Sequence, residues 1–368
     1  MNRLGSLFGA ALVAAGTVSP AVALDRVGSL DATQRTQTLV NSVSQAWLAA
    51  EWRSYAARFV SAEGRVIDNA NGGISHSEGQ GYGMLLAAKA KDAGRFETLW
   101  RWTAHTLQVR KDGLLAWKWD PGAKAVTDIN NATDGDILVA WALAEAGRTF
   151  NRPDYTKAAA ALAHAIGTHG LLPTAHGPVL LPGVTGFGAG AQPDGPVINL
   201  SYWVFPAFPT LAELAPEFDW AGVRHSGLAL LEQSRFGTFG VPTEWESLAG
   251  ASPQPAAGFP TAFGYNAIRI PLYLALDGNE DARQALRRFA GTWAQTASTT
   301  QLLEAHPVPV TVPLGQPGYG LVMATARCVS AGAAVPPETI SARSDLYFPE
   351  TLRLLSVIAI QERYSACL

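Results

Sequence analysis

The sequence predicts an all-α fold in which helices come in pairs, as they do in an α/α toroid where six inner helices are ringed by six outer ones. Helical spacing of apolar residues recurs along almost the whole chain, and the connections within pairs are short. Strand patterns are few, and two long Gly- and Pro-rich stretches interrupt the helices. A generic helical bundle or a solenoid is the competing arrangement.

The first residues predict a secretion signal. Arg3 and the amino terminus are positive, "LFGAALVAAGTV" is apolar, and "AVA" at 21–23 suits signal peptidase. We expect a signal peptide over 1–23, a single domain over 24–368, and a periplasmic or secreted protein that does not span the membrane after cleavage. Two cysteines, Cys328 and Cys367, could pair in that oxidising compartment, but the sequence leaves open whether they do.

The apolar patterns predict about a dozen helices, near residues 33–49, 51–60, 78–92, 93–108, 134–148, 153–167, 200–215, 218–234, 263–276, 279–297, 318–331 and 344–363. "LLAWKWD" (114–120) and "VPVTV" (308–312) predict short strands. The segments 168–197 and 247–263 are predicted to be long loops, which in a compact domain are usually functional. A net charge of −3 without basic runs argues against nucleic acid as a partner.

Three predicted helix starts carry polar residues. In "SHSEGQGYGM", Ser75 and Glu78 have the spacing of a capping box; in "NNATDGDILV", Thr133 can cap the helix; in "FGYNAIRI", Asn266 and Arg269 share a helix face. Each alone is explained by helix capping. In a toroid, however, the inner helices run parallel and their N-termini gather at one rim. We therefore predict that these polar residues converge on a shared cleft.

The first of these helices contains Gly79, Gly81 and Gly83. Each should cost roughly 1 kcal/mol relative to alanine inside a helix. We interpret them as places where the rings of a ligand approach the backbone closely. A sugar polymer fits, because its faces stack on aromatic rings and its hydroxyls need many polar partners.

Glycoside hydrolysis needs a carboxylic acid to protonate the leaving oxygen and a second group that activates water or attacks. Glu78 is the predicted acid. Since a helix N-terminus favours the charged form of a carboxyl group, a neighbouring carboxylate is needed to help keep Glu78 protonated. Asp134 is the candidate, and the two should lie within about 12 Å of each other.

"SEGQGYGM", "NATDGDILVAWAL" and "GYNAIRIPLYLAL" resemble the three signature segments of family 8 glycoside hydrolases. "LLAWKW", "LLPGVTGFG", "INLSYW" and "SDLYFPETL" also occur in the right order, so the resemblance covers nearly all of the mature chain. Within the family, the chain is most similar to the endo-β-1,4-glucanases that accompany bacterial cellulose synthase.

The resemblance implies an (α/α)6 barrel with an open groove for a glucan chain, and inversion at the anomeric carbon without a metal or other cofactor. It implies β-1,4-glucan (cellulose) as the bound polymer and association with a cellulose synthase complex; mixed-linkage glucan, chitosan and xylan remain open as substrates. By position, Glu78 would be the general acid and Asp134 would bind and help distort the sugar. The groove would be lined by Trp117, Trp119, Tyr202, Arg269 and Tyr347.

The third segment departs from the family pattern, which places an aspartate general base where this chain has Asn266. A neutral amide cannot take a proton from water near pH 7. Three outcomes stay open: a substitute carboxylate, weak catalysis without a base, or a protein that binds and organises glucan without cutting it. Glu244 is the first candidate for the substitute base, beside a groove-type Trp245, and Glu246 and Asp194 are the others.

Overall fold

The computed structural model describes residues 32–237, 239–293, 298–301 and 311–368. The chain divides into two compact units, Met1–Trp47 and Leu48–Leu368. Of the first unit, only the beginning of helix α2 (Ala32–Phe59) is described. The predicted signal peptide and the predicted domain start at residue 24 lie outside the described residues. The second unit holds the remaining helices and all of the described strands.

Six helices form an inner ring. α3 packs on α5, α5 on α7, α9 on α11 and α13, and α13 returns to α3, while the short 3-10 helix η2 (Phe205–Ala207) joins α7 to α9. α3, α5, α9 and α13 are buried on nearly every side, as expected of helices that are apolar all round. The ring consists of α3 (Ser77–Lys89), α5 (Thr133–Thr149), α7 (Phe208–Leu214), α9 (Arg269–Asp277), α11 (Pro317–Ala331) and α13 (Tyr347–Arg363).

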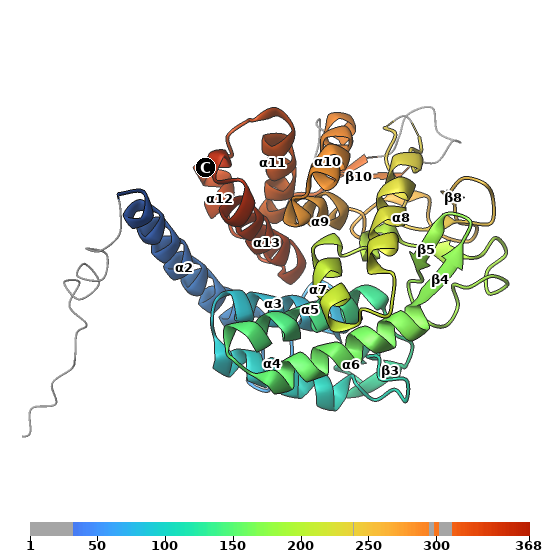
Figure 1. The fold of residues 1–368 in the computed structure, drawn as a ribbon, viewed down its shortest axis with the longest axis horizontal. Helices are drawn as coiled ribbons and strands as arrows, with labels where there is room; N and C mark the ends of the chain where they lie inside the picture. Colours follow the sequence, from blue (N-terminus) through green and yellow to red (C-terminus); the bar gives the residue numbers. More distant parts are fainter. Residues whose placement is uncertain (1–31, 238, 294–297, 302–310) are drawn as a thin grey trace, which may run out of the picture. The chain divides into compact units, whose positions relative to one another are not determined.

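A second set of helices covers this ring (Figure 1). α4 packs on α3, α6 on α5, α8 on α7, α10 on α9, and α12 on α11. Only one face of α4, α6 and α8 is buried, which is the pattern of an outer layer. The prediction of an all-α (α/α)6 barrel is confirmed. The covering helices are α4 (Ala93–Thr106), α6 (Pro153–Gly170), α8 (Trp220–Gln233), α10 (Glu280–Trp293) and α12 (Pro337–Ser341).

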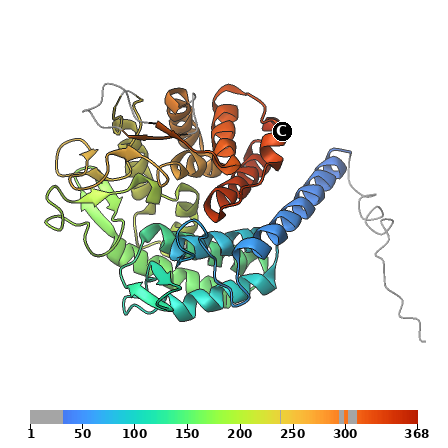
Figure 2. The same ribbon diagram turned by 180° about the vertical axis from the view of Figure 1, so that it is seen from behind.

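Short antiparallel strands occupy the connections between helices, and the β4–β5 hairpin and β8 lie at the same side of the unit in Figures 1 and 2. β1 leads directly into α3 and pairs with β2, and β2 pairs with β3. The strands are β1 (Ser75–His76), β2 (Lys118–Asp120), β3 (Ala125–Asp128), β4 (Leu171–Thr174), β5 (Gly177–Leu180), β6 (Val197–Ile198), β7 (Glu246–Ser247), β8 (Gln254–Pro255), β9 (Ala262–Phe263), β10 (Ser298–Gln301) and β11 (Thr311–Pro313).

Several predicted boundaries are wrong for local reasons. The two helices predicted over 33–60 are one, α2. The helix predicted over 200–215 is two 3-10 turns, Leu200–Tyr202 and Phe205–Ala207, followed by α7, because Pro206 and Pro209 interrupt the helical hydrogen bonds. The helix predicted from residue 263 begins at Arg269, and the predicted loop 168–197 contains the β4–β5 hairpin.

The two predicted strand segments each contain a shorter strand. "LLAWKWD" holds β2, which covers only its last three residues. "VPVTV" overlaps β11, and its residues 308–310 lie outside the described part of the chain. Within the described residues, no helix combines the length and the apolar character needed to cross a membrane.

The two cysteines are paired. Cys328 on α11 forms a disulfide with Cys367 in the 3-10 turn Ser365–Cys367, and their Cα atoms lie 5.8 Å apart. The bridge closes a segment of 39 residues and fixes the end of the chain against the barrel.

Candidate active site

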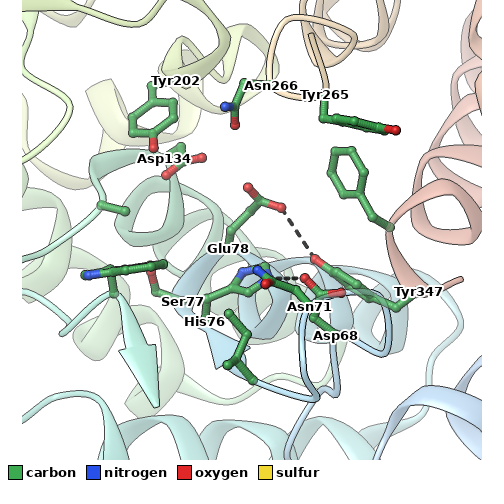
Figure 3. A pocket seen from close by; sticks show the side chains of 14 residues that line it. Asp68, Asn71, His76, Ser77, Glu78, Asp134, Tyr202, Tyr265, Asn266 and Tyr347 are labelled. Carbon is green, nitrogen blue, oxygen red and sulfur yellow. Dashed lines mark hydrogen bonds and ion pairs between the residues drawn. The ribbon is translucent and has the colours of Figure 1, made fainter. Parts of the chain in front are cut away.

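A cleft of about 280 Å³ opens where α3, α5 and α13 begin and beside the turn that precedes α9 (Figure 3). The predicted convergence of polar helix starts is therefore present. The cleft is lined by Asp68, Asn71, Ile74, His76, Ser77, Glu78, Trp117, Ala132, Asp134, Tyr202, Tyr265, Asn266, Tyr347 and Phe348.

Two carboxylates and one guanidinium form the centre of the cleft. Nη1 of Arg269 lies 2.6 Å from Oε2 of Glu78 and 2.6 Å from Oδ2 of Asp134. Because both oxygens contact the same nitrogen, the two carboxylates lie well within the predicted limit of about 12 Å, and the predicted proximity is confirmed. The side chain of Glu78 is 16% exposed, whereas those of Asp134 and Arg269 are 2% and 0% exposed. Glu78 therefore reaches the cleft, and its two partners lie beneath it.

Arg269 also binds Ser201 and Asn266, which lie on the other side of its guanidinium from the two carboxylates. Nη2 donates to Oγ of Ser201 and to Oδ1 of Asn266, each at 3.0 Å, and Nε donates to the backbone oxygen of Asn266 at 3.2 Å. The guanidinium lies over the ring of Tyr202, with Cζ 5.4 Å from the ring centre. One planar cation thereby sets the orientation of both carboxylates and of the Asn266 amide.

The environment of Asp134 keeps a proton within the carboxylate pair. Burial raises the pKa of Asp134 to about 6, although Arg269 acts in the opposite direction, and the negative charge of Glu78 adds to the rise. In mildly acidic solution one proton therefore resides on the pair. A carboxyl pair that shares a proton is a recurring arrangement in acid–base catalysis.

Glycines at the interface of α3 and α5 bring the two carboxylates together. A Cβ on Gly81 would lie 2.5 Å from Cβ of Leu138, and one on Gly135 would lie 2.0 Å from Oγ of Ser77. A Cβ on Gly83 would lie 2.7 Å from a methyl of Val66. The interpretation of Gly81 and Gly83 as places where a ligand meets the backbone is wrong, since the protein itself fills that space.

The helix caps also differ from prediction. The N-cap of α3 is His76, whose Nδ1 accepts from the Gly79 amide at 3.1 Å, while Ser75 Oγ donates to the oxygen of Val66. Thr133 lies inside α5 and donates to the oxygen of Leu181 at 2.6 Å. The hydroxyls of Ser75 and Thr133 therefore bind neighbouring loops at the helix starts and do not cap the helices.

Glu244 lies directly behind the position of the missing base. Its Oε1 accepts a hydrogen bond from the backbone N–H of Asn266 at 2.7 Å. A Cβ on Gly264 would lie 2.6 Å from the same oxygen, so the glycine leaves room for the carboxylate. The side chain is half-buried, and within the described residues its Oε2 has no hydrogen bond.

The other two candidate bases are engaged elsewhere. Glu246 is fully buried and accepts from Oγ of Ser234 at 2.5 Å, and burial raises its pKa to about 8, so it is neutral near pH 7. Oδ2 of Asp194 accepts from the amide of Ala257 at 2.8 Å and joins two loops. None of the three candidate bases, Glu244 included, is among the residues that line the cleft, but only Glu244 contacts a lining residue at the base position, Asn266.

Three of the predicted groove aromatics line the cleft. Oη of Tyr347 donates to Oε1 of Glu78 at 3.4 Å, and Tyr202 lies on the other side of Glu78 (Figure 3). Trp117 also lines the cleft. Nε1 of Trp117 donates to Asp128 at 2.7 Å, and the ammonium of Lys118 lies 4.9 Å from the Trp117 ring centre.

The other two predicted tryptophans lie outside the lining. Trp119 packs edge-on against Trp102 and beneath Arg65. Trp245 stacks on the rings of Phe187 and Phe259, with centroids 5.5 and 4.8 Å away. Its ring surface is therefore used for packing between two loops.

Sequence reasoning missed six polar or aromatic residues of the lining: Asp68, Asn71, His76, Ser77, Tyr265 and Phe348. The last four are next to or two residues from predicted site residues, so adjacency was an available signal. Nothing in the spacing of Asp68 and Asn71 connects their loop to the three helix starts.

Comparison with known proteins identifies the family. The model of glycosyl hydrolases family 8 matches residues 32–362. The chain belongs to this family. It is a glycoside hydrolase by that membership, and the cluster of Glu78, Asp134 and Arg269 lies in its cleft.

Relatives within the family are similar over most of their length. A probable endoglucanase of Novacetimonas hansenii is 36% identical over 325 residues, which are 86% of this chain and 91% of the relative. The structure of an endo-β-1,4-glucanase from Acetobacter xylinum superposes with a TM-score of 0.73 at 34% identity, covering 85% of this chain and 97% of that one. An endoglucanase from Komagataeibacter sucrofermentans gives a TM-score of 0.74 at 33% identity, covering 86% and 98%.

Proposed function

We propose that this glycoside hydrolase cleaves internal β-1,4 bonds of a glucan chain with inversion at the anomeric carbon. The observation that carries the proposal is the pair of carboxylates, Glu78 in the cleft and Asp134 beneath it, held by one nitrogen of Arg269. The substrate class is supported by the relatives described as endoglucanases. Aromatic rings on both sides of the cleft suit the apolar faces of sugars.

Glu78 supplies the proton in this mechanism. Its carboxyl group is the exposed member of the pair, and Oη of Tyr347 orients it toward the cleft. Asp134 accepts from Arg269 and from the amide of Gly135 at 2.8 Å, so its position is fixed while it binds sugar hydroxyls. As the glycosidic bond breaks, the leaving oxygen takes the proton of Glu78.

Glu244 is the general base of the proposed mechanism. Asn266 cannot accept a proton, and its amide oxygen is already bound by Arg269. The Glu244 carboxylate is held by the Asn266 amide through one oxygen, which leaves the other oxygen to take a proton from water. Inversion requires roughly 6.5–9.5 Å between the acid and base carboxyls, so that water fits between them.

The acid assignment is tested on carboxymethyl cellulose. We expect new reducing ends together with a rapid fall in viscosity, because an endo-acting enzyme shortens chains from within. Glu78→Gln keeps the shape of the side chain and removes the transferable proton, so its kcat should fall about 10²–10⁴-fold. Proton NMR of the first product should show the α-anomer. Unchanged turnover by Glu78→Gln, or a β-anomer, would contradict the mechanism.

The base assignment needs paired variants. Glu244→Gln can still accept the Asn266 amide, so it removes the base and keeps the contact; we expect a fall of about 10²–10⁴-fold in kcat. Adding Asn266→Asp to that variant should return activity, since it places a carboxylate where the family carries its base. Full activity of Glu244→Gln alone would reject Glu244.

Chemical rescue distinguishes a missing base from a damaged cleft. In Glu244→Ala, azide needs no deprotonation and can attack the anomeric carbon as Glu78 protonates the leaving oxygen. The product is a glycosyl azide of α configuration. Absence of this product at high azide concentration, from a variant that still binds glucan, would count against Glu244 as the base.

A second candidate function is suggested by Asn266. If no carboxylate replaces the aspartate of the family, the cleft binds and organises glucan without cutting it, or cuts it feebly. Affinity electrophoresis in carboxymethyl cellulose measures binding apart from turnover. Retarded migration of both wild type and Glu78→Gln, with no reducing ends from either, would favour this function over hydrolysis.

The location and the cellular role of the enzyme are also proposals. The predicted signal peptide and the Cys328–Cys367 disulfide both suit a periplasmic or secreted protein, because disulfides persist in oxidising compartments. We propose that the enzyme acts on nascent cellulose, in association with a cellulose synthase complex. Co-purification of the tagged protein with that complex, and altered cellulose in a strain carrying Glu78→Gln, are the tests.

A further inference from the structure

His76 occupies a special place beside the proposed acid. It is the N-cap of α3, and its Nδ1 accepts from the amide of Gly79, the residue after Glu78. On the other side of the ring, Nε2 lies 3.4 Å from Oδ2 of Asp68 (Figure 3). The side chains of His76 and Asp68 are each 13% exposed, and both line the cleft.

These contacts fix the protonation state of the ring. Because a backbone N–H donates to Nδ1, that nitrogen carries no proton, and the proton of the neutral ring lies on Nε2, facing Asp68. Asp68 is oriented in turn, since its Oδ1 accepts from the amide of Ala70 at 3.1 Å. The chain of contacts therefore runs from Asp68 through His76 to the backbone under Glu78.

We propose that His76, oriented by Asp68, is a positioning residue for Glu78: its neutral ring holds the first turn of α3 in place, and its protonation at low pH disables the acid. The inference rests on the proposed role of Glu78 as proton donor. His76 itself transfers no proton to the substrate.

Packing around Gly79 shows why a small movement matters. The ring of Tyr347 meets His76 edge-on, with centroids 5.7 Å apart, and Oη of Tyr347 contacts Glu78. A Cβ on Gly79 would lie 3.2 Å from that Oη and 3.4 Å from Cε1 of His76. Since no space is left between these groups, loss of the cap displaces Tyr347 and Glu78 together.

The surrounding charges set the direction of the pH effect. The groups that face His76 are Asp68, Glu78, Asp134 and Tyr347, and on β2 its pairing partner Lys118 directs its ammonium to the Trp117 ring. Burial favours the neutral ring, but the hydrogen bond to Asp68 and the charges of Glu78 and Asp134 raise the pKa of His76 overall.

Protonation of His76 removes the cap, because a doubly protonated ring cannot accept from the Gly79 amide. The contribution of the cap to activity is therefore present above the raised pKa of His76 and is lost as the pH falls through it.

Two substitutions separate capping from titration. His76→Ala removes the cap, and we expect kcat to fall at least about tenfold with little change in KM, because a slightly misplaced catalytic group loses rate more than binding. His76→Asn keeps a capping oxygen and does not titrate. It should recover most of kcat at pH 7, and the acid limb of its pH profile should move to lower pH and become less steep.

Asp219→Ala is the matched control. Asp219 caps α8 by accepting from the amide of Gly222 at 2.8 Å, and it does not line the cleft. Its loss should lower thermal stability as His76→Ala does, yet leave kcat and the pH profile unchanged. Nitrogen NMR of the substrate-free protein should also show the Nε2–H form of His76 above its pKa.

Wild-type kcat in His76→Ala, or an unshifted acid limb in His76→Asn, would overturn the inference. Failure of the proposed function would give other results. The wild-type protein would yield no product, or Glu78→Gln would stay active, while NMR would still show the Nε2–H form of His76.

Discussion

Arg269 is the residue on which the charge balance of the cleft depends. It is fully buried and bonds Glu78, Asp134, Ser201 and Asn266. Arg269→Met leaves two carboxylates close together without a counter-charge, so we expect a loss of about 3–5 kcal/mol in unfolding free energy at pH 7. The loss should be smaller near pH 5, where one proton resides on the carboxylate pair. Urea unfolding at the two pH values measures both.

Arg269→Lys is the companion variant, because it keeps the charge and loses the planar fork. An ammonium cannot hold two carboxylates and an amide in one plane. Stability should therefore be retained better than in Arg269→Met, while kcat/KM falls by at least about a hundredfold. Equal stability losses in both variants would show that the charge of Arg269 contributes nothing to folding.

Glu246 gives a pH dependence of stability that has no connection with catalysis. Its folded pKa of about 8 is above the ordinary value, so the unfolded chain loses this proton first, and stability declines as the pH rises from about 4 to about 8. Glu246→Gln stays neutral in both states. Between pH 5 and pH 8 we expect its unfolding free energy to gain about 3 kcal/mol relative to wild type.

Denaturant unfolding across that range measures the gain. Glu213→Gln, which changes a carboxyl group that is 73% exposed, serves as the control and should show no comparable gain. A constant difference between Glu246→Gln and wild type at all pH values would mean that Glu246 is ionised in the folded state.

At the scale of single residues, the sequence predicted which groups meet but missed the residue that caps the first helix beside them. Glu78, Asp134, Asn266 and Arg269 were predicted because each begins or precedes an inner helix. His76 was missed because the serine before it already satisfied a capping spacing. The pattern could not show which residue's side chain points toward the helix amide.

At the scale of helices, the contact between α3 and α5 sets the geometry of the acid. Gly81 faces Leu138 and the amide of Val139, where an added Cβ would lie 2.5 and 3.0 Å away. Gly81→Ala must separate the two helices, so we expect a loss of about 1–3 kcal/mol in stability and a reduced kcat. Thermal unfolding and initial rates on carboxymethyl cellulose check both.

Gly320→Ala is the matched control, since Gly320 lies in α11 and a Cβ there would have no neighbour within 4 Å. It should stabilise the protein by up to about 1 kcal/mol through helix propensity. A stabilising Gly81→Ala would mean that α3 and α5 can move apart without cost.

Helices with a continuous apolar stripe were predicted well, whereas elements whose course depends on individual prolines or glycines were not. The helical pattern over 200–215 is real, but two prolines break it into turns. The β4–β5 hairpin was missed because its strands contain Gly177, Pro173 and Pro178, residues that weaken a strand signal.

At the scale of the whole molecule, closure of the ring creates the site. Glu78 is 191 positions from Arg269 and 269 positions from Tyr347, and these residues meet because α13 packs back on α3. The order of helix pairs predicted that convergence. It could not place Glu244, which belongs to a connection and reaches Asn266 through the path of its own loop.

The disulfide is the last constraint on the closed ring. It ties Cys328 of α11 to Cys367 near the end of the chain, where the oxygen of Cys367 also accepts from the amide of Val335 at 2.8 Å. Closing a segment of 39 residues restricts the unfolded chain, so replacing both cysteines by serine should cost about 4 kcal/mol of unfolding free energy.

Catalysis should be unaffected by this change at temperatures where the variant is folded, because neither cysteine lines the cleft. Urea unfolding and initial rates measured on the same samples separate stability from activity. Dithiothreitol should lower the stability of the wild type and leave the double serine variant unchanged. If reduction instead lowers kcat while the barrel remains folded, the bridge must control the position of α13, and through Tyr347 the position of Glu78.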